Sequence, residues 1–517
     1  MTRPGIASLL AVLFVLVGSP AAARAAEGDS RPNIIYVMSD DHGWQAISAY
    51  GSNRNKTPNI DRLAREGMRL DRFFVGNSIC APARATMLTG LHSHANGMMD
   101  NRTVFDGSQR TIAKMLHAAG YQTVMLGKWH LESEPTAFDY FDHVVGQGTY
   151  YNPEFRRGGL ADGYEQYTET GYVTDIITDK AIDWIENRRD TDRPFLMLLH
   201  NKAPHRPWDP APRHLTLFDD VQIPEPATLF DDWSGRGTPA HTQEMTIAEH
   251  LFPRDLKFER PWNLNESQRR MWDSVYGPKN DAFNAMALAG DDLVRWKYQR
   301  YVKDYLRCVQ AVDENVGRLL DELTHSGLDE NTIVIYTSDQ GWYLGENGWF
   351  DKRWMYEESF RTPFLVRWPG VIPEGSTSTA LTQNIDIAPT MLDAAGLGVP
   401  DDMHGVSMLP VLRGHTPDDW RRSLYYRYYE YPGWHSVRRH EGVRTERYTL
   451  IHFYEPDVDE WEFYDLDADP GEMSNAIDKP RYAEKIAELK KELERLKTLY
   501  HVPPGEFYTV PEDGRRE

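Results

Sequence analysis

Two segments of the chain end in carboxylate and amide side chains that could hold a metal ion. The apolar run NIIYVMSDD ends in Asp40 and Asp41, and the run TIVIYTSDQG ends in Asp339 with Gln340 close behind. Each pair alone could cap a helix, but oxygen ligands at the ends of two strands favour a metal site. Oxygen-only coordination is typical of a hard divalent ion such as calcium or magnesium, whereas zinc prefers His and Cys.

One of the two cysteines lies in NSICAPARATMLTG (77–90), just ahead of a predicted helix. Pro82 suits the first position of that helix, so Cys80 is expected beside free N–H groups that attract anions. Arg84 follows one turn later on the same face. A cysteine beside a metal, an arginine and a helix start suits anionic chemistry, although an isolated Cys-x-Pro-x-Arg would in most proteins be a chance match. Cys308 is expected to pack in a long helix, so no disulfide is predicted.

The elements that position these residues read as alternating strands and helices. Two further apolar runs, TVMLGKWH and PFLMLLHNKAPH, introduce Lys128, His130 and His205. Between the four runs lie helical patterns such as TDIITDKAIDWIENR, which implies a mainly parallel sheet of an α/β fold. The carboxyl ends of parallel strands open onto one crevice, so the polar groups should converge there. The alternative is that each strand simply ends in a polar loop.

A change in the sequence pattern near the C-terminus predicts a large domain followed by a smaller one. We expect a catalytic α/β domain over 31–415 and an α+β subdomain over 416–517, because aromatic alternating segments from SLYYRYYEY onward read as a small antiparallel sheet. The charged segment RYAEKIAELKKELERLKTLY reads as a surface helix. Residues 218–292 show weak periodicity and are predicted to be a substrate-facing insertion.

The N-terminus predicts an exported protein. Residues 1–26 carry Arg3, an apolar run and an Ala-rich end, which is typical of a signal peptide. No later segment is apolar enough to span a membrane, so we expect a periplasmic or extracellular protein without stable membrane association. The net charge of −21 becomes −23 when Arg3 and Arg24 are removed with the signal. Such an acidic chain argues against nucleic-acid binding, which needs a basic face.

The string CAPARATMLTG resembles the signature of the formylglycine-dependent sulfatases, the type I, arylsulfatase-like family. Further matching elements occur in the family's order across nearly the whole mature chain: NIIYVMSDD, GKWH, KAPH, SDQG and DKRWMYEES. The resemblance implies an alkaline-phosphatase-like α/β sandwich with a large, mainly parallel sheet between helices and a small C-terminal antiparallel sheet with a helix. It also implies hydrolysis of sulfate esters.

The resemblance assigns roles to the candidate residues. Cys80 would be oxidised to formylglycine, the nucleophile, by a formylglycine-generating maturase. The calcium ligands, besides an oxygen of that modified side chain, would be Asp40, Asp41, Asp339 and Gln340. Arg84 would steady the hydrate with Lys128 and His130 close by, while His205 as proton donor and Lys352 would contact the sulfate and the leaving oxygen. Relatives often have Asn or His where this chain has Gln340, and Lys128, His130 or Lys352 could instead have only structural roles.

The expected substrate is a sulfated carbohydrate, because the sequence is similar to bacterial sulfatases that act on glycans such as glycosaminoglycans. Trp434, His435, Arg439 and His440, in the C-terminal subdomain, could contact a sugar ring, although aromatic strand faces are more often core. Two alternatives stay open. One is a phosphonate monoester or phosphodiester hydrolase of the same superfamily, and the other is a non-catalytic protein that binds sulfated glycans.

Overall fold

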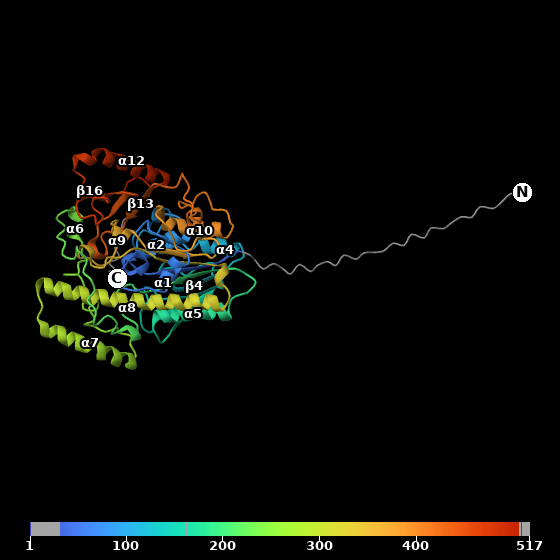
Figure 1. Ribbon diagram of the computed structural model, residues 1–517, viewed down its shortest axis with the longest axis horizontal. Helices are drawn as coiled ribbons and strands as arrows, with labels where there is room; N and C mark the ends of the chain where they lie inside the picture. The colour runs from blue at the N-terminus through green and yellow to red at the C-terminus, as the bar shows by residue number, and fades with distance from the viewer. Residues whose placement is uncertain (2–30, 162, 506–507, 509–517) are drawn as a thin grey trace.

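The computed structural model describes Met1 and residues 31–161, 163–505 and 508. The predicted signal peptide therefore lies outside the described residues. Within them, no helix is both long and apolar enough to cross a membrane. Figure 1 shows a large sheet covered on both faces by helices, with a second, smaller sheet and α12 above it.

The large sheet has ten strands in the order β11-β2-β10-β9-β1-β8-β4-β5-β6-β7. Its centre is four neighbouring parallel strands: β9 (Thr332–Ser338), β1 (Asn33–Ser39), β8 (Phe195–His200) and β4 (Gln122–Lys128). These are the four apolar runs of the sequence, so the predicted parallel sheet is confirmed. The strands end in register, with Ser39 opposite Ser338, and Met38 opposite His200. The residues that follow them therefore meet at one edge.

Shorter strands complete both sides of this centre. They are β5 (Tyr140–Val144), β6 (Glu154–Gly159), β7 (Tyr164–Thr168), β10 (Phe364–Arg367), β2 (Met68–Leu70) and β11 (Ser376–Ser378). Strands β6, β7 and β10 pair antiparallel with their neighbours, so the sheet is mixed at its margins. A separate pair is formed by β3 (Phe73–Phe74) and β12 (Thr382–Gln383).

Helices cover the sheet because successive strand residues point to opposite faces. Ile35 and Val37 of β1 face one hydrophobic core, whereas Ile34 and Tyr36 face the other. The first core is closed by α1 (Ile60–Arg65), α5 (Val173–Asn187) and α8 (Gly290–His325). The second is closed by α2 (Cys80–Thr89), α4 (Ile112–Ala118), α10 (Ile387–Ala394) and α11 (Leu409–Leu412). The helices predicted at Cys80, at TDIITDKAIDWIENR and around Cys308 are thus present as α2, α5 and α8.

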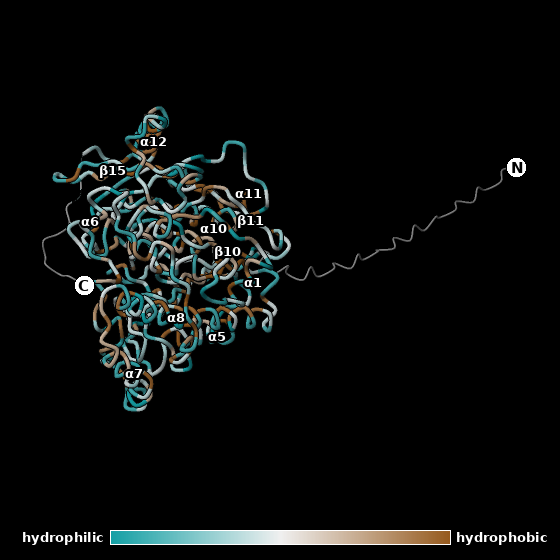
Figure 2. Tube along the Cα trace, turned by 60° about the vertical axis from the view of Figure 1, so that its left-hand side comes forward, coloured by the Kyte–Doolittle hydropathy of each residue, from teal (hydrophilic) through white to brown (hydrophobic). Residues whose placement is uncertain are grey.

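The C-terminal part is the predicted antiparallel sheet with a helix. Its strands are β13 (Ser423–Tyr428), β14 (His440–Thr445), β15 (Tyr448–Glu455) and β16 (Val458–Asp465). Helix α12 (Ala483–Leu499) lays an apolar stripe of Ile486, Leu489, Leu493 and Leu496 on one face, as its i, i+3, i+7 spacing requires. Figure 2 shows the mixed hydrophilic and hydrophobic character of α12 at the upper end of the molecule.

The other face of the small sheet packs against the catalytic part of the chain. Trp354 and Tyr356 share a core with Phe453 and Tyr464. Because Trp354 and Tyr356 follow Lys352 closely in the chain, the segment that carries Lys352 is held by the small sheet. Other short helices are α3 (Ser93–Asn96), α6 (Thr238–Thr242) and α9 (Glu357–Phe360). The domain boundary at 415/416 stays a prediction.

The predicted insertion contains a long helix that the sequence reading missed. Helix α7 (Glu266–Met286) has 21 residues and lies alongside α8, to which a short connection joins it (Figure 1). Gly277 and Pro278 interrupt its pattern, because both residues normally disfavour a helix interior. Its start was readable, since Asn265 and Gln268 form a reciprocal capping box.

Candidate active site

The structure brings the predicted oxygen ligands together at the edge of the parallel sheet. Asp40 and Asp41 follow β1, while Asp339 and Gln340 follow β9. Carboxylate oxygens of the three aspartates lie within 4.8 Å of one another, and all three side chains are buried. The backbone N–H of Asp41 donates to Oδ1 of Asp339 at 3.1 Å, which ties the two strand ends together.

The charges in this cluster suit a divalent cation. Burial, together with the charge of Asp40, raises the pKa of Asp41 to about 6 and that of Asp339 well above its usual range. Burial acts in the same direction on Asp40, but Lys128, His205 and Arg84 hold the pKa of Asp40 well below its usual range. Oε1 of Gln340 is buried without a hydrogen-bond partner in the described structure. An oxygen-only, anionic cluster with a free amide oxygen fits a hard metal ion.

Cys80 begins α2 and points into this cluster. Its Sγ lies 3.3 Å from Oδ1 of Asp40, 3.4 Å from Nζ of Lys352 and 3.6 Å from Nε2 of Gln340. The helix begins at Cys80 itself, two residues earlier than the position predicted from Pro82. Burial and the neighbouring Asp40 raise the pKa of the thiol well above its usual range. With the protein groups alone, the thiol is therefore in its neutral form at neutral pH.

Arg84 and Lys128 are buried cations that connect α2 to the strand ends. Nη2 of Arg84 donates to Oδ2 of Asp339 at 3.0 Å, and its Nη1 donates to the carbonyl of Lys128 at 2.6 Å. Nζ of Lys128 donates to Oδ2 of Asp40. The alternative that Lys128 is a surface cation is excluded, because its side chain is fully buried.

His205 and Lys352 lie close to Cys80, and His130 lies near Lys128 and Arg84. Nζ of Lys352 lies 2.7 and 2.9 Å from the two carboxylate oxygens of Asp41. Nε2 of His205 lies 3.7 Å from Oδ2 of Asp41. Burial and then Lys128 lower the pKa of both His205 and His130 well below the usual range, so both rings are neutral at neutral pH.

The tautomer of His205 follows from its second nitrogen. Nδ1 lies 2.6 Å from the backbone carbonyl of Arg206, which can only accept, so Nδ1 carries the proton. The lone pair is then on Nε2, the atom that faces Asp41. Neutral His205 accepts a proton at Nε2, and it can act as the predicted proton donor only once it has been protonated.

A pocket of about 450 Å³ leads to these groups. Its wall includes His205 and Lys352 and, from the insertion, Phe252, Arg254 and Asp255. The insertion therefore borders the candidate site, as the sequence predicted. Trp434 and His435 also line the pocket, and Nε2 of His435 lies 3.2 Å from Oδ2 of Asp351.

The other two predicted sugar contacts are placed elsewhere. Arg439 donates to both oxygens of Glu455, at 2.6 and 2.8 Å, and is buried against the small sheet. His440 packs between Trp354 and Phe453, and its Nε2 accepts from the backbone N–H of Met355 at 3.1 Å. Neither residue lines the pocket, so the structure does not bring Arg439 and His440 to the candidate site. The aromatic sequence pattern did not indicate that Arg439 pairs with a carboxylate or that His440 packs inside a hydrophobic core.

Sequence reasoning missed several pocket residues. These are Asn101, Gln147, Lys202, Arg206, Asp351 and Arg353. Lys202 lies in the motif KAPH, and Asp351 and Arg353 flank Lys352, so motif position was an available signal for these three. Gln147 accepts a hydrogen bond from Lys128, and Asn101 accepts one from the N–H of Ala81 at 2.9 Å. Nothing in the sequence around Asn101 or Gln147 suggests a site.

Lys202 gives the pocket a testable pH dependence. Burial, and then Lys128, lowers the pKa of Lys202 to about 8. As the pH rises through this value the ammonium loses its charge, so we expect kcat/KM for an anionic ester to fall by up to about tenfold per pH unit. In Lys202→Arg, whose guanidinium stays charged, this decline should disappear. A pH profile of kcat/KM for both proteins checks this, and an unchanged alkaline decline in Lys202→Arg contradicts it.

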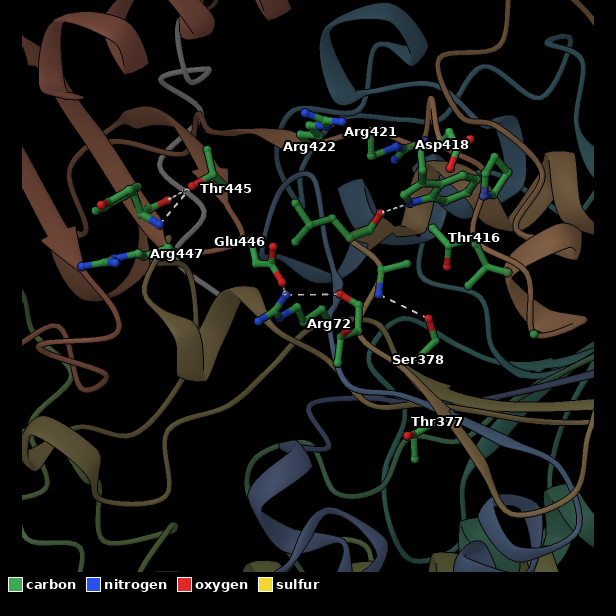
Figure 3. Close-up of a pocket in the computed structure, with 18 of the residues that line it drawn as sticks. Arg72, Thr377, Ser378, Thr416, Asp418, Arg421, Arg422, Thr445, Glu446 and Arg447 are labelled. Carbon is green, nitrogen blue, oxygen red and sulfur yellow. Dashed lines mark hydrogen bonds and ion pairs between the residues drawn. The ribbon is translucent and has the colours of Figure 1, made fainter. Parts of the chain in front are cut away.

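A larger hollow of about 880 Å³ lies between β11 and the small sheet, and it contains none of the predicted site residues. Figure 3 shows its charged lining, with Arg72 joined to Glu446 by an ion pair. Arg421 pairs with Asp386 at 2.5 Å, and Arg447 pairs with Asp465 at 2.7 Å. Because most of its cations already have acidic partners, this hollow is not the candidate site.

Comparison with known proteins places the chain in one family. Residues 32–397 match the Sulfatase family, and residues 345–499 match the C-terminal region of N-sulphoglucosamine sulphohydrolase. An N-acetylglucosamine-6-O-sulfatase from Bacteroides thetaiotaomicron is 49% identical, over 98% of this chain and 94% of the relative.

Solved structures agree with this assignment. One, described as a complex with its substrate D-glucosamine-2-N,6-O-disulfate, has a TM-score of 0.89 at 49% identity and covers 92% of this chain and 99% of the other. A phosphonate monoester hydrolase from Agrobacterium radiobacter has a TM-score of 0.65 at 20% identity, covers 91% of this chain and 96% of the other, and shares only the fold. The chain therefore belongs to the sulfatase family and is a sulfuric ester hydrolase, as the sequence predicted.

Proposed function

We propose that this enzyme removes sulfate from a sulfated carbohydrate, with a 6-O-sulfated glucosamine residue as the preferred substrate class. The observation that carries the proposal is the position of Cys80, whose Sγ lies 3.3 Å from Asp40 and 3.4 Å from Lys352 at the base of the pocket. The 49% identical relative that acts on N-acetylglucosamine 6-O-sulfate supports the choice of sugar.

We propose that Cys80 is converted to formylglycine by a maturase. A neutral, buried thiol beside Asp40 is a poor nucleophile, since the thiolate is the reactive form. The aldehyde hydrate of formylglycine would supply an oxygen nucleophile at this position. Asp40, Asp41, Asp339 and Gln340 would hold calcium, which would offset the negative charge gathered there.

The cations of the site are placed to receive a sulfate group. Lys352 donates to Asp41 and Lys128 donates to Asp40, and both ammonium groups can shift to the sulfuryl oxygens when an ion takes over those carboxylates. Arg84 is fixed by Asp339 and the carbonyl of Lys128, so it holds the start of α2 against the carboxylates. His205 reaches the pocket with Nε2, where it accepts a proton and can return it to a leaving oxygen.

The pocket wall supports a sugar ligand. Trp434 and Phe252 offer apolar faces, while Asp351, Arg353 and His435 offer polar groups that are themselves fixed by hydrogen bonds. Sugar binding sites commonly combine a few precisely held polar groups with aromatic surface. Contacts from Trp434 and His435 to the sugar are part of this proposal.

The deciding experiment is sulfate release from a panel of defined sugars by the matured enzyme. We expect glucosamine 6-O-sulfate and its N-acetylated form to be hydrolysed faster than 2-O-sulfated sugars. Nitrophenyl sulfate and a nitrophenyl phosphonate, assayed in parallel, separate the phosphorus-ester alternative. Faster phosphonate turnover, or tight sugar binding without any sulfate release, contradicts the proposal.

His205→Ala should affect substrates with poor leaving groups most. A sugar alkoxide needs a proton as it leaves, whereas nitrophenolate does not, so we expect kcat to fall by about 10²-fold or more on the sugar and far less on nitrophenyl sulfate. The matched control is His143→Ala, a buried histidine that bonds Glu134 outside the pocket. Equal losses on both substrates contradict a proton-transfer role for His205.

We further propose that the protein is exported to the periplasm or the cell exterior and matured there or on the way. The N-terminal sequence and the sulfated glycan substrate class support this. Peptide mass spectrometry of material co-expressed with a maturase tests the modification, because formylglycine and cysteine differ in mass. An unmodified Cys80 in fully active enzyme contradicts it.

A further inference from the structure

A further hollow, of about 570 Å³, lies between α7 and α8 and has a strongly cationic lining. Among its lining residues only Asp219 is acidic, whereas the cations are Lys279, Arg295, Arg300, Lys303 and Arg307. The whole chain has a net charge of −21, so this concentration of positive charge is local and opposite in sign to the protein. We call this hollow, with these lining residues, the basic pocket.

The basic pocket lies on the far side of α8 from the catalytic centre. Tyr305 donates to the carbonyl of Asp41 at 2.7 Å, and Tyr301 on the same face donates to the carbonyl of Tyr343 at 2.6 Å. Arg300, Lys303 and Arg307 are spaced i, i+3, i+7 and so share one face of α8, which at about 100° per residue is roughly opposite the face of Tyr301 and Tyr305. No residue that lines the basic pocket also lines the catalytic pocket.

Nearby acids do not neutralise the cations of the basic pocket. Asp219 already accepts from Lys279 at 2.7 Å and from Arg307 at 2.6 Å. Asp304, beneath the pocket, accepts from Arg307 at 2.6 Å and lies 4.0 Å from buried Lys257. Arg295 lies 3.4 Å from Glu225 and 3.8 Å from Asp292, whereas Arg300 and Lys303 have no carboxylate within 4.0 Å in the part of the chain that the structure describes. Four carboxylates therefore face the five cations of the pocket and Lys257. The balance is positive.

Arg300 carries a buried donor nitrogen for which the described residues provide no acceptor. The residue is 8% exposed, and its buried Nη1 has no hydrogen-bond partner within the described structure. Nη2 donates to Asn280 at 3.1 Å, and the guanidinium stacks on Trp296, 5.0 Å from the ring centroid. Burial lowers the pKa of Arg300, and burial with Arg307 lowers that of Lys303. A buried donor without a partner is costly, so an incoming acceptor would be stabilising.

We propose that the basic pocket is an accessory site that binds a sulfate group of a sulfated glycan chain, away from the residue being hydrolysed. A sulfate group offers several charged acceptor oxygens, which suit a mixture of lysine and arginine donors. Trp296 and Met286 add apolar surface at the edge of the pocket for the attached sugar ring. The inference rests on the proposed action on sulfated carbohydrate.

The insertion connects the two pockets. It supplies Arg254 to the catalytic pocket and Lys279 to the basic pocket. A glycan held at the basic pocket would therefore stay tethered to the enzyme while another residue of the same glycan, or of a second glycan, reaches the catalytic pocket. Tethering raises the effective concentration of the reacting group without a new catalytic contact.

The test measures binding separately from turnover. In a Cys80→Ala background, which cannot hydrolyse the ligand, Lys303→Gln and the pair Lys279→Gln/Lys303→Gln are titrated with heparin by calorimetry. The matched control is Lys479→Gln/Lys491→Gln, which removes the same charge from exposed lysines of the C-terminal part. We expect the pocket pair to raise the Kd for heparin about tenfold at low salt, and the difference to shrink as salt screens the charges.

Each outcome decides the proposal. An unchanged heparin Kd in both pocket variants overturns it, and so does an equal rise in the control pair, which would indicate non-specific attraction. Weaker binding of inorganic sulfate with heparin binding unchanged makes the pocket a free-sulfate site and also overturns it. With Cys80 intact, kcat and KM for glucosamine 6-O-sulfate should not change in the pocket variants. Absence of any sulfate release in the parent enzyme counts against the proposed function instead, while the heparin titration still decides the accessory site.

Discussion

Replacing Cys80 with alanine should lower kcat on every sulfate ester by at least about 10⁴-fold, because no other group near the carboxylates can take the nucleophile's place. Asp40, Lys352 and Gln340 all contact Sγ of Cys80, so the substitution removes the one side chain on which these three groups converge. Single-turnover assays with nitrophenyl sulfate measure the effect. Calcium binding should persist in this variant, because three carboxylates and one amide are unaltered.

The matched control is Cys308→Ala, the other cysteine of the chain. Cys308 is buried in α8 and lies 3.9 Å from the hydroxyl of Tyr172. Its loss leaves a small cavity, so we expect a destabilisation of about 1 kcal/mol and an unchanged kcat. Cys80→Ala enzyme that keeps a tenth or more of its activity contradicts the nucleophile assignment. A comparable loss of kcat in Cys308→Ala shows that the assay reports folding and not chemistry.

The central sheet and its polar edge could be predicted because both depend on short stretches of sequence. Runs such as TIVIYTS are apolar at every position, which only a strand covered on both faces tolerates. Parallel pairing then places whatever follows the strands at one edge. For the same reason Asp40, Asp339 and His205 were found together without knowledge of the strand order.

What could not be predicted depends on packing between distant segments. His440 has the same aromatic neighbours in sequence whether it faces a ligand or a core, and only its contact with Met355 decides. Lys202 and Gln147 become site residues because folding brings both of them close to Lys128. The pKa of Cys80 is likewise set by burial and by Asp40, 40 positions away in the chain.

The small C-terminal sheet has a physical role in positioning the catalytic loop. The hydroxyl of Tyr426 donates to the carbonyl of Arg353 at 2.6 Å, and His440 accepts from the N–H of Met355 at 3.1 Å. Both contacts lie within three residues of Lys352. Because the loop is tied to β13 and β14 through backbone groups, Lys352 is held toward Cys80 without a helix or strand of its own.

Asp339→Asn should remove metal binding and activity together. Asp339 accepts from Arg84 through Oδ2 and from the N–H groups of Asp41 and Gln340 through Oδ1. Asparagine keeps the size of the side chain but removes one charge from the cluster. We expect calcium affinity to fall about 100-fold and kcat at least about 10²-fold.

The binding change can be measured without activity. Calcium that binds only the folded protein raises its thermal midpoint as concentration increases, and this rise should need about 100-fold more calcium in Asp339→Asn. The control is Asp313→Asn. Asp313 is a buried carboxylate that accepts from the N–H groups of Asn59 and Ile60 at 3.0 and 2.8 Å, and it has no proposed role in metal binding. This control should unfold at lower temperature and keep the calcium response of the parent.

The same titration has a predicted pH dependence. The pKa of Asp41 is about 6 in the folded protein, above the ordinary value for aspartate, so acidification through about pH 6 protonates a ligand that calcium requires. Proton and metal compete for the same oxygens, and we expect the calcium-dependent rise in the midpoint to be largest above pH 6 and to fade below it. In Asp41→Asn no such competition occurs at that position, so its weaker calcium response should vary less between about pH 5 and pH 7. A calcium response that is independent of pH in the parent, or unaltered in Asp339→Asn, contradicts the assignment of this carboxylate cluster as the metal site.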